Sequence, residues 1–310
     1  MLDIARLRRY DKVGQEFLIS YRMRASMAQD WADKIAQELL NPGLIQTGVC
    51  LILGAADTGK TTLAEAIARR AASSGPVAVI DADIGQSHIG PPTTVGWALV
   101  DRPDVSFSQL AVSGISFVGD VTPVGHLLQL TAAMAQCVRQ ATESAALIII
   151  DTPGFVYGPA ASALWWTVER VLQPKSILAV QRNDELSDIL SGLRSLALKV
   201  ELIKSPAQIP TKSLQNRQSY RQSRFNEYFR DSCLHNITLS EIAVQSGRNL
   251  DRVSLVHRLV ALRDEKGMDI AIGVISEWQG GKDTVVVKAP RLDVRQIRCL
   301  IIGDHSIEMP

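Results

Sequence analysis

A glycine-rich loop between a short apolar run and an amphipathic segment limits the folds open to this chain more than any other feature. The run Val49 to Leu53 predicts a buried strand, and residues 62–72 predict a helix. Between them stands Gly-Ala-Ala-Asp-Thr-Gly-Lys-Thr, residues 54–61, which fits the pattern G-x-x-x-x-G-K-[ST]. Such a string predicts a P-loop, in which glycines let backbone N–H groups crowd around a polyphosphate. The alternative is a tight turn in which Gly54 and Gly59 have no ligand.

The predicted loop assigns binding roles to consecutive residues. The Lys60 ammonium would neutralise β- and γ-phosphate oxygens, and the Thr61 hydroxyl would be a ligand of Mg²⁺. The predicted nucleotide-binding residues are Gly54, Ala55, Ala56, Asp57, Thr58, Gly59, Lys60, Thr61 and Thr62.

A second polar string, Asp-Ala-Asp-Ile-Gly-Gln at residues 81–86, follows the short β-rich run 77–80. Residues just past the carboxyl end of a strand in an open parallel sheet face the ligand crevice. If the strand persisted, Asp81 and Asp83 would point to one face. We therefore expect both carboxylates to face the metal and the γ-phosphate.

Length and composition indicate how many domains the chain can form and where in the cell we expect it. The chain has 310 residues, of which 46% are hydrophobic and 21% charged, enough for one large α/β domain and a smaller companion. A net charge of +1 leaves no global basic field, so any nucleic-acid contact must come from a local patch. The four cysteines form no C-x-x-C pair, and no signal peptide or membrane-spanning run is apparent. We expect a soluble, cytoplasmic protein without membrane contact.

Periodicity divides the chain into three predicted parts. Residues 1–46 form a helical extension with Asp30 as N-cap and Asn-Pro-Gly at 41–43 as its stop, and its basic residues favour a solvated helix face over a nucleic-acid arm. Residues 47–231 alternate apolar runs (146–150, 176–180, 200–203) with helical stripes such as 127–138, which is typical of βαβ units. Residues 232–310 contain predicted strands at 268–277, 284–288 and 298–302. The predicted fold class is an α/β P-loop parallel sheet flanked by helices, with a small C-terminal β-rich domain.

A basic segment at about 205–230 closes the middle part. Its arginines Arg217, Arg221 and Arg224 follow one another along one side of a helix. Guanidinium groups stay charged and offer a rigid fork of donors, so this face could clamp a transferring phosphoryl group. A solvated basic helix face is the alternative.

The string Asp-Thr-Pro-Gly-Phe at residues 151–155 follows a predicted strand and should emerge beside the P-loop. It is also similar to the γ-phosphate switch of GTPases. A GTPase would add N-K-x-D after a later strand, and residues 179–185 read Ala-Val-Gln-Arg-Asn-Asp-Glu instead. A turn residue without a catalytic part remains the other interpretation of Phe155.

Taken together, these motifs resemble the polynucleotide 5′-hydroxyl kinase family linked to mRNA 3′-end, tRNA and rRNA processing. The resemblance rests on the aspartate inside the P-loop, on D-x-D-x-G-Q at 81–86, on the segments 117–127 and 224–229, and on the turn 262–267. It covers roughly residues 48–307 and leaves out the N-terminal extension, so the chain looks like compact prokaryotic relatives.

The resemblance implies a role for each matching residue. Lys60 stabilises the transferring phosphate, and Thr61, Asp81 and Asp83 lie at Mg²⁺. Asp83 is the general base for the 5′-hydroxyl, and Gln86 helps to position the substrate or the metal-bound water. Arg217 and Arg221 match the R-x-x-x-R lid, with Arg224 one turn further. Thr152 to Phe155 match the T-x-G-W clasp that holds the terminal nucleotides, where Phe155 replaces tryptophan but can still stack on a base.

The expected function is therefore an ATP-dependent kinase that acts on the 5′-hydroxyl end of RNA or DNA in RNA processing or repair. The alternatives are a catalytically weak NTP-binding scaffold of an RNA-processing complex and a regulatory GTPase. Protein partners cannot be named from the sequence.

Overall fold

A computed structural model describes residues 26–41, 45–102, 106–193, 198–247, 255–278 and 283–308 of the chain. Five parallel strands form the central sheet of the first two thirds of the chain. They are β1 (Gly48–Leu53), β2 (Val77–Asp81), β5 (Leu147–Asp151), β6 (Ser176–Gln181) and β7 (Lys199–Lys204), in the order β7-β6-β1-β5-β2. This order places the P-loop strand β1 between β6 and β5. The carboxyl ends of all five strands therefore meet at one edge, where ligands of such sheets bind.

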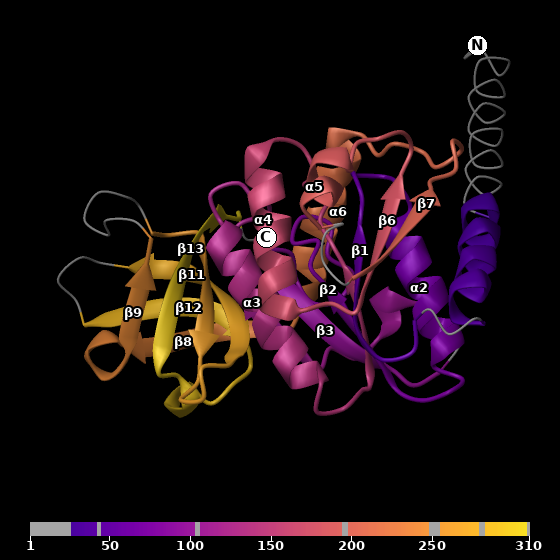
Figure 1. Ribbon diagram of the computed structural model, residues 1–310. Helices are drawn as coiled ribbons and strands as arrows, with labels where there is room; N and C mark the ends of the chain where they lie inside the picture. The colour runs from indigo at the N-terminus through magenta and orange to yellow at the C-terminus, as the bar shows by residue number, and fades with distance from the viewer. Residues whose placement is uncertain are drawn as a thin grey trace, which may run out of the picture.

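Helices cover both faces of the parallel strands (Figure 1). On one face, α2 (Lys60–Ala71) and the helical residues 26–40 pack against alternate residues of β1 such as Cys50 and Ile52. On the other face, α3 (Leu127–Ala141), α4 (Pro159–Leu172) and α5 (Ser187–Leu193) pack against Leu51 and Leu53. The central strands β1, β2, β5 and β6 are mostly apolar because both of their faces are covered, whereas the edge strand β7 alternates polar and apolar residues. The predicted α/β class is confirmed.

The helix before β1 differs from its prediction at the start. Residues 26–40 are already helical, so Asp30 lies inside the helix and the prediction that it is the N-cap is wrong. An N-cap has a non-helical backbone, and here Met27 and Ala28 continue the helix on the N-terminal side of Asp30. The helix ends at residue 40, before the Asn-Pro-Gly stop, as predicted. The basic residues of the extension lie outside the described residues.

Two antiparallel strands that were not predicted, β3 (Thr94–Val100) and β4 (Gly114–Phe117), extend the sheet beyond β2. The β4 strand then pairs with β11 (Asp269–Trp278), so the C-terminal strands continue the same sheet. Those strands are β8 (Ser232–Thr238), β9 (Ala243–Ser246), β10 (Arg258–Arg263), β12 (Thr284–Pro290) and β13 (Cys299–Ser306). Short 3-10 turns η1 (Phe107–Gln109), η2 (Leu239–Glu241) and η4 (Val294–Gln296) lie in the connections.

The junction between the two groups of strands is narrow but strongly bonded. A single registered pair, Asp269 with Ile115, joins β11 to β4. The buried Asp269 carboxylate accepts hydrogen bonds from Arg263 Nε at 2.7 Å and from the Phe117 backbone N–H at 2.7 Å. The predicted strands at 268–277, 284–288 and 298–302 are confirmed, whereas the predicted domain boundaries stay a prediction. Within the described residues, no helix has the length and apolarity that a membrane crossing requires.

Candidate active site

The P-loop turns sharply from the end of β1 into α2. Asp57 (φ 58°) and Gly59 (φ 94°) both have left-handed backbone conformations. A Cβ on Gly54 would lie 2.4 Å from the Val180 carbonyl oxygen, so only glycine fits there. The loop thus leads directly to the N-terminus of α2 at Lys60, where unpaired backbone N–H groups favour an anion.

The Lys60 side chain lies buried within this loop. Its Nζ donates to the Ala55 carbonyl oxygen at 2.9 Å, and the Thr58 hydroxyl donates to the same oxygen at 2.9 Å. Burial lowers the pKa of Lys60, while the charges of Asp151, Asp83 and Asp57 raise it. Negative side chains thus surround the ammonium at the point where the motif places the phosphates.

Thr61 forms a close pair with Asp151, the last residue of β5. The Thr61 hydroxyl donates to Asp151 Oδ2 at 2.5 Å, and the other carboxylate oxygen, Oδ1, is buried without a hydrogen-bond partner. Hydroxyl and carboxylate oxygens are the ligands that Mg²⁺ takes beside a bound triphosphate. No cluster of three or more metal-ligating side chains occurs among the described residues. This pattern fits Mg²⁺, which keeps waters and binds through few protein groups.

Asp151 was not among the predicted site residues. Two sequence signals pointed to it: a carboxylate at the end of an apolar strand, as for Asp81, and its place at the start of the Asp-Thr-Pro-Gly string that was expected beside the P-loop. The two residues are directly opposite each other on the neighbouring strands β5 and β2.

The Asp81 carboxylate holds the loop that follows β2. Its Oδ2 accepts from the backbone N–H groups of His88 (2.5 Å) and Ile89 (3.0 Å), and its Oδ1 accepts from that of Asp83 (3.1 Å). Burial, helped by the charge of Asp83, raises the pKa of Asp81 to about 7 against these hydrogen bonds. The predicted metal contact of Asp81 stays a prediction.

Asp83 and Gln86, in the loop after β2, each have a side-chain oxygen that accepts no hydrogen bond from the described residues. Asp83 is half-buried, and its Oδ1 accepts from the N–H groups of Gly85 (3.2 Å) and Gln86 (3.1 Å). Its Oδ2 accepts no hydrogen bond from the described residues. The Gln86 Nε2 donates to the Gly85 carbonyl at 2.8 Å and to the Arg217 carbonyl at 3.2 Å, whereas its Oε1 is buried without a partner. A buried acceptor without a donor is costly, so Gln86 is suited to a ligand, and the half-buried Asp83 has an oxygen free to accept a hydrogen bond from one.

The predicted arginine helix, α6 (Leu214–Tyr228), lies against the P-loop. Arg217 Nη2 pairs with Asp57 Oδ2 at 2.6 Å, and the Lys212 backbone N–H donates to the same oxygen at 3.0 Å. The Tyr220 hydroxyl donates to the Ser87 carbonyl at 3.0 Å. The helix therefore bridges the P-loop and the loop after β2, as a lid would.

The other two arginines have different surroundings. Arg221 is half-buried and pairs with no carboxylate among the described residues. Arg224 Nη2 donates to the carbonyls of His88 (3.0 Å) and Gly90 (3.1 Å), and its Nη1 pairs with Glu227 at 2.6 Å. Its Nη2 thus holds the loop after β2, its Nε is buried without a partner, and its substrate contact stays a prediction.

The predicted clasp residues lie between β5 and α4. Thr152 is buried, and its hydroxyl donates to the Ile52 carbonyl at 2.6 Å. Phe155 is half-buried and packs against the core under α3 and α4, and its carbonyl accepts from Trp165 Nε1 at 2.7 Å. Their contact with a substrate stays a prediction.

Comparison with known proteins agrees with this geometry. Residues 54–231 match the family described as mRNA cleavage and polyadenylation factor CLP1 P-loop. The chain is 32% identical over 195 residues to the polyribonucleotide 5′-hydroxyl-kinase of Pyrococcus abyssi. The aligned residues cover 63% of this chain and 54% of that protein. It is 30% identical over 258 residues to the kinase of the same name from Thermococcus kodakarensis, covering 81% and 71%.

The fold is also similar to a solved structure of the Clp1p–Pcf11p complex, with a TM-score of 0.66 and 13% identity over 94% of this chain and 79% of that one. The chain spans little more than half the length of its Pyrococcus relatives, 54% in P. abyssi and 57% in P. horikoshii. The family match includes the P-loop, the 81–86 string and the arginine helix, and residues 54–231 are more than half of the 310 residues. The chain therefore belongs to the CLP1 P-loop family.

Proposed function

We propose that this chain is an ATP- and Mg²⁺-dependent kinase that transfers the γ-phosphoryl group of ATP to the 5′-hydroxyl end of RNA or DNA, in RNA processing or repair. One observation carries the proposal: Asp83, with an unused carboxylate oxygen, lies close enough to act electrostatically on both Lys60 and Asp151. This arrangement would put a general base beside the proposed phosphate and metal site. The name of the relatives, polyribonucleotide 5′-hydroxyl-kinase, supports the acceptor.

Each residue would contribute a separate part of the transfer. Asp83 takes the proton of the 5′-hydroxyl, whose oxygen attacks the γ-phosphorus while the bond to the departing ADP oxygen breaks. The Lys60 ammonium and the guanidinium groups of Arg217 and Arg221 stabilise the charge on the phosphoryl oxygens. Gln86, between Asp83 and the lid, orients the substrate.

Thr61 and Asp151 would hold Mg²⁺, with Asp81 and Asp83 as further candidates. The ion, when bound, neutralises charge on the phosphate oxygens. We also propose a cytoplasmic location, because all four cysteines are unpaired and three are buried, as is usual in a reducing compartment.

The test is label transfer from γ-labelled ATP to a short 5′-hydroxyl oligonucleotide, in single- and double-stranded RNA and DNA. We expect transfer by the wild type and none by Lys60→Ala or Asp83→Ala. Asp101→Ala is the matched control, because the Asp101 side chain is 77% exposed and lies outside the site. Unlabelled ATP should compete with the labelled ATP better than unlabelled GTP does. A wild type that binds ATP but transfers no label would refute the kinase and favour an NTP-binding scaffold.

A further inference from the structure

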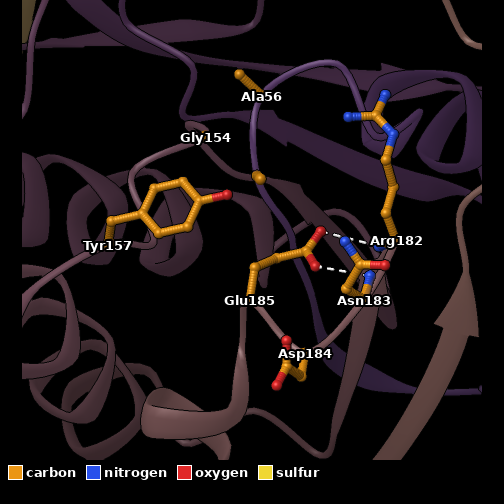
Figure 2. Close-up of a pocket in the computed structure, with 8 residues that line it drawn as sticks. Ala56, Gly154, Tyr157, Arg182, Asn183, Asp184 and Glu185 are labelled. Carbon is orange, nitrogen blue, oxygen red and sulfur yellow. Dashed lines mark hydrogen bonds between the residues drawn. The ribbon is translucent and has the colours of Figure 1, made fainter.

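An open cavity beside the P-loop has no part in the chemistry described so far. Its volume is about 460 Å³, and it lies between the loop that follows β5 and the loop that follows β6. Its walls are Ala55 and Ala56 of the P-loop, Gly154 and Tyr157 on one side, and residues 182–185 on the other (Figure 2). A Cβ on Gly154 would lie 2.5 Å from the Ala56 nitrogen. The P-loop and the loop after β5 therefore touch at this point and close the bottom of the cavity.

An exposed aromatic ring forms one wall of the cavity. Tyr157 is 67% exposed, and its hydroxyl end points across the cavity toward Glu185 (Figure 2). Phe155, two residues earlier, is turned into the core instead. Gly158 (φ 83°) follows the tyrosine and lets the chain turn, and Pro159, the first residue of α4, restricts the backbone where the helix begins. The ring available for stacking is therefore that of Tyr157.

The opposite wall is polar but does not suit a phosphate. Glu185 accepts the backbone N–H groups of Arg182 (2.8 Å) and Asn183 (2.9 Å), which closes this loop on itself. Burial opposes its ionisation, but these hydrogen bonds lower the pKa of Glu185 overall, so it stays charged. Arg182 Nη2 donates to the Asp57 carbonyl at 2.5 Å, so this end of its guanidinium is bonded to the P-loop. With the carboxylates of Asp184 and Glu185 at the cavity, an anion is repelled, whereas a nucleobase offers a ring to stack and N–H donors.

The cavity also lies in line with the acceptor site. Along the edge of the sheet the strands follow one another as β6, β1, β5 and β2, and Asp83 follows β2. Neighbouring strands are about 4.8 Å apart, so the ends of β2 and β1 are separated by about 10 Å. A nucleic-acid strand whose 5′ end lies at Asp83 can cross Gly154 and reach the cavity with its next nucleotides.

We propose that this cavity is a base-binding subsite for the acceptor strand, in which the Tyr157 ring stacks on the base of a nucleotide just downstream of the 5′-hydroxyl. The proposal rests on the proposed kinase function, and it names the residue that grips the strand. It also gives a reason why phenylalanine is tolerated at position 155, since the stacking contact lies two residues further along the chain.

The test compares Tyr157→Ala with Tyr157→Phe and with Val171→Ala, a matched exposed position on α4 that is 50% exposed. Stacking of one base on an aromatic ring corresponds to about a tenfold change in affinity or more. We expect Tyr157→Ala to raise KM for the oligonucleotide about tenfold, with kcat, KM for ATP and the melting temperature unchanged. Tyr157→Phe and Val171→Ala should behave as the wild type.

A second measurement uses oligonucleotides with an abasic site at the second or third nucleotide. One of these substrates should weaken the wild type as much as Tyr157→Ala does, and the variant should show no further loss with it. An unchanged oligonucleotide KM in Tyr157→Ala, or fully additive losses, would overturn the subsite. Should the wild type transfer no phosphate, the kinase proposal fails, and fluorescence anisotropy of oligonucleotide binding with the same variants and the same abasic substrates decides the subsite separately.

Discussion

Replacing Asp151 by asparagine should make the nucleotide-free protein more stable while it abolishes phosphoryl transfer. Burial at the end of β5 and the charge of Asp81 raise the pKa of Asp151 from its ordinary 3.8 to about 7, although Lys60 and the Thr61 hydrogen bond act in the opposite direction. At neutral pH the folded protein therefore holds a carboxylate that its surroundings disfavour. Asparagine has nearly the same shape and can accept the Thr61 hydrogen bond without the charge.

The size of the effect follows from the pKa. One pKa unit is worth about 1.4 kcal/mol, so a rise from 3.8 to about 7 opposes folding by about 4 kcal/mol at pH 8. Asp81 and Asp151 repel each other, and protonation of one relieves both, so we expect about 2 kcal/mol from this substitution alone. In a chain of this length that raises the melting temperature by about 4 °C.

The sign of the pH dependence is as specific as its size. A carboxyl group whose pKa is raised by folding contributes stability below its unfolded pKa, and that contribution is lost as the pH rises through its folded pKa. The advantage of Asp151→Asn should therefore be full at pH 8 and less than half as large at pH 5.

Thermal unfolding of the wild type, Asp151→Asn and Asp83→Asn at both pH values, without nucleotide, measures this advantage. Asp83→Asn is the control. Because Asp83 is only half-buried, its replacement should raise the melting temperature less than Asp151→Asn does. Label transfer by Asp151→Asn should fall at least a hundredfold. A lower melting temperature at pH 8, or an equal gain at both pH values, would refute the reasoning.

Three further changes test the P-loop, the lid and the junction of the sheet. Asp57→Asn and Arg217→Lys each break the pair between P-loop and lid, so each should lower kcat/KM about tenfold or more, and the double variant should lose little beyond either one in a double-mutant cycle. Gly54→Ala places a methyl group against the Val180 carbonyl and should abolish ATP binding in a titration, whereas Gly247→Ala, with open space around its Cβ, should bind normally. Asp269→Ala leaves Arg263 without its partner and should lower the free energy of unfolding by about 3 kcal/mol in denaturant titrations.

Features that lie within one short segment were predictable from the sequence. The P-loop is such a case, because eight consecutive residues specify both the turn and the chemistry. The strands β1, β2, β5 and β6 are others, since continuous apolar runs between helical stripes specify buried parallel strands. The arginine helix was also visible from its spacing.

Pairings between distant segments were not predictable. The Thr61–Asp151 pair joins residues 90 apart in the chain, and only the strand order brings them together. A carboxylate at a strand end also looks the same in the sequence whether it faces a metal or, like Asp81, holds backbone N–H groups. The antiparallel strands β3 and β4 escaped prediction because Gly96 interrupts the apolar pattern of β3 and because β4 is only four residues long.

The two ends of the arginine helix are held in different ways: Phe225, near its C-terminus, is buried in apolar packing, whereas its N-terminal half is held by polar contacts such as the Arg217–Asp57 pair. Phe225 and Phe229, near its C-terminus, are buried with Phe117 of β4 and Leu259 of β10, at the junction of the sheet. Arg217 lies eight residues away, which is about 12 Å along a helix. A tilt of about 10° around Phe225 would move the Arg217 end by about 2 Å, enough to break its pair with Asp57. The helix would therefore pivot where it packs on the C-terminal strands, and a small change in that packing would produce a larger movement of Arg217 beside the phosphates.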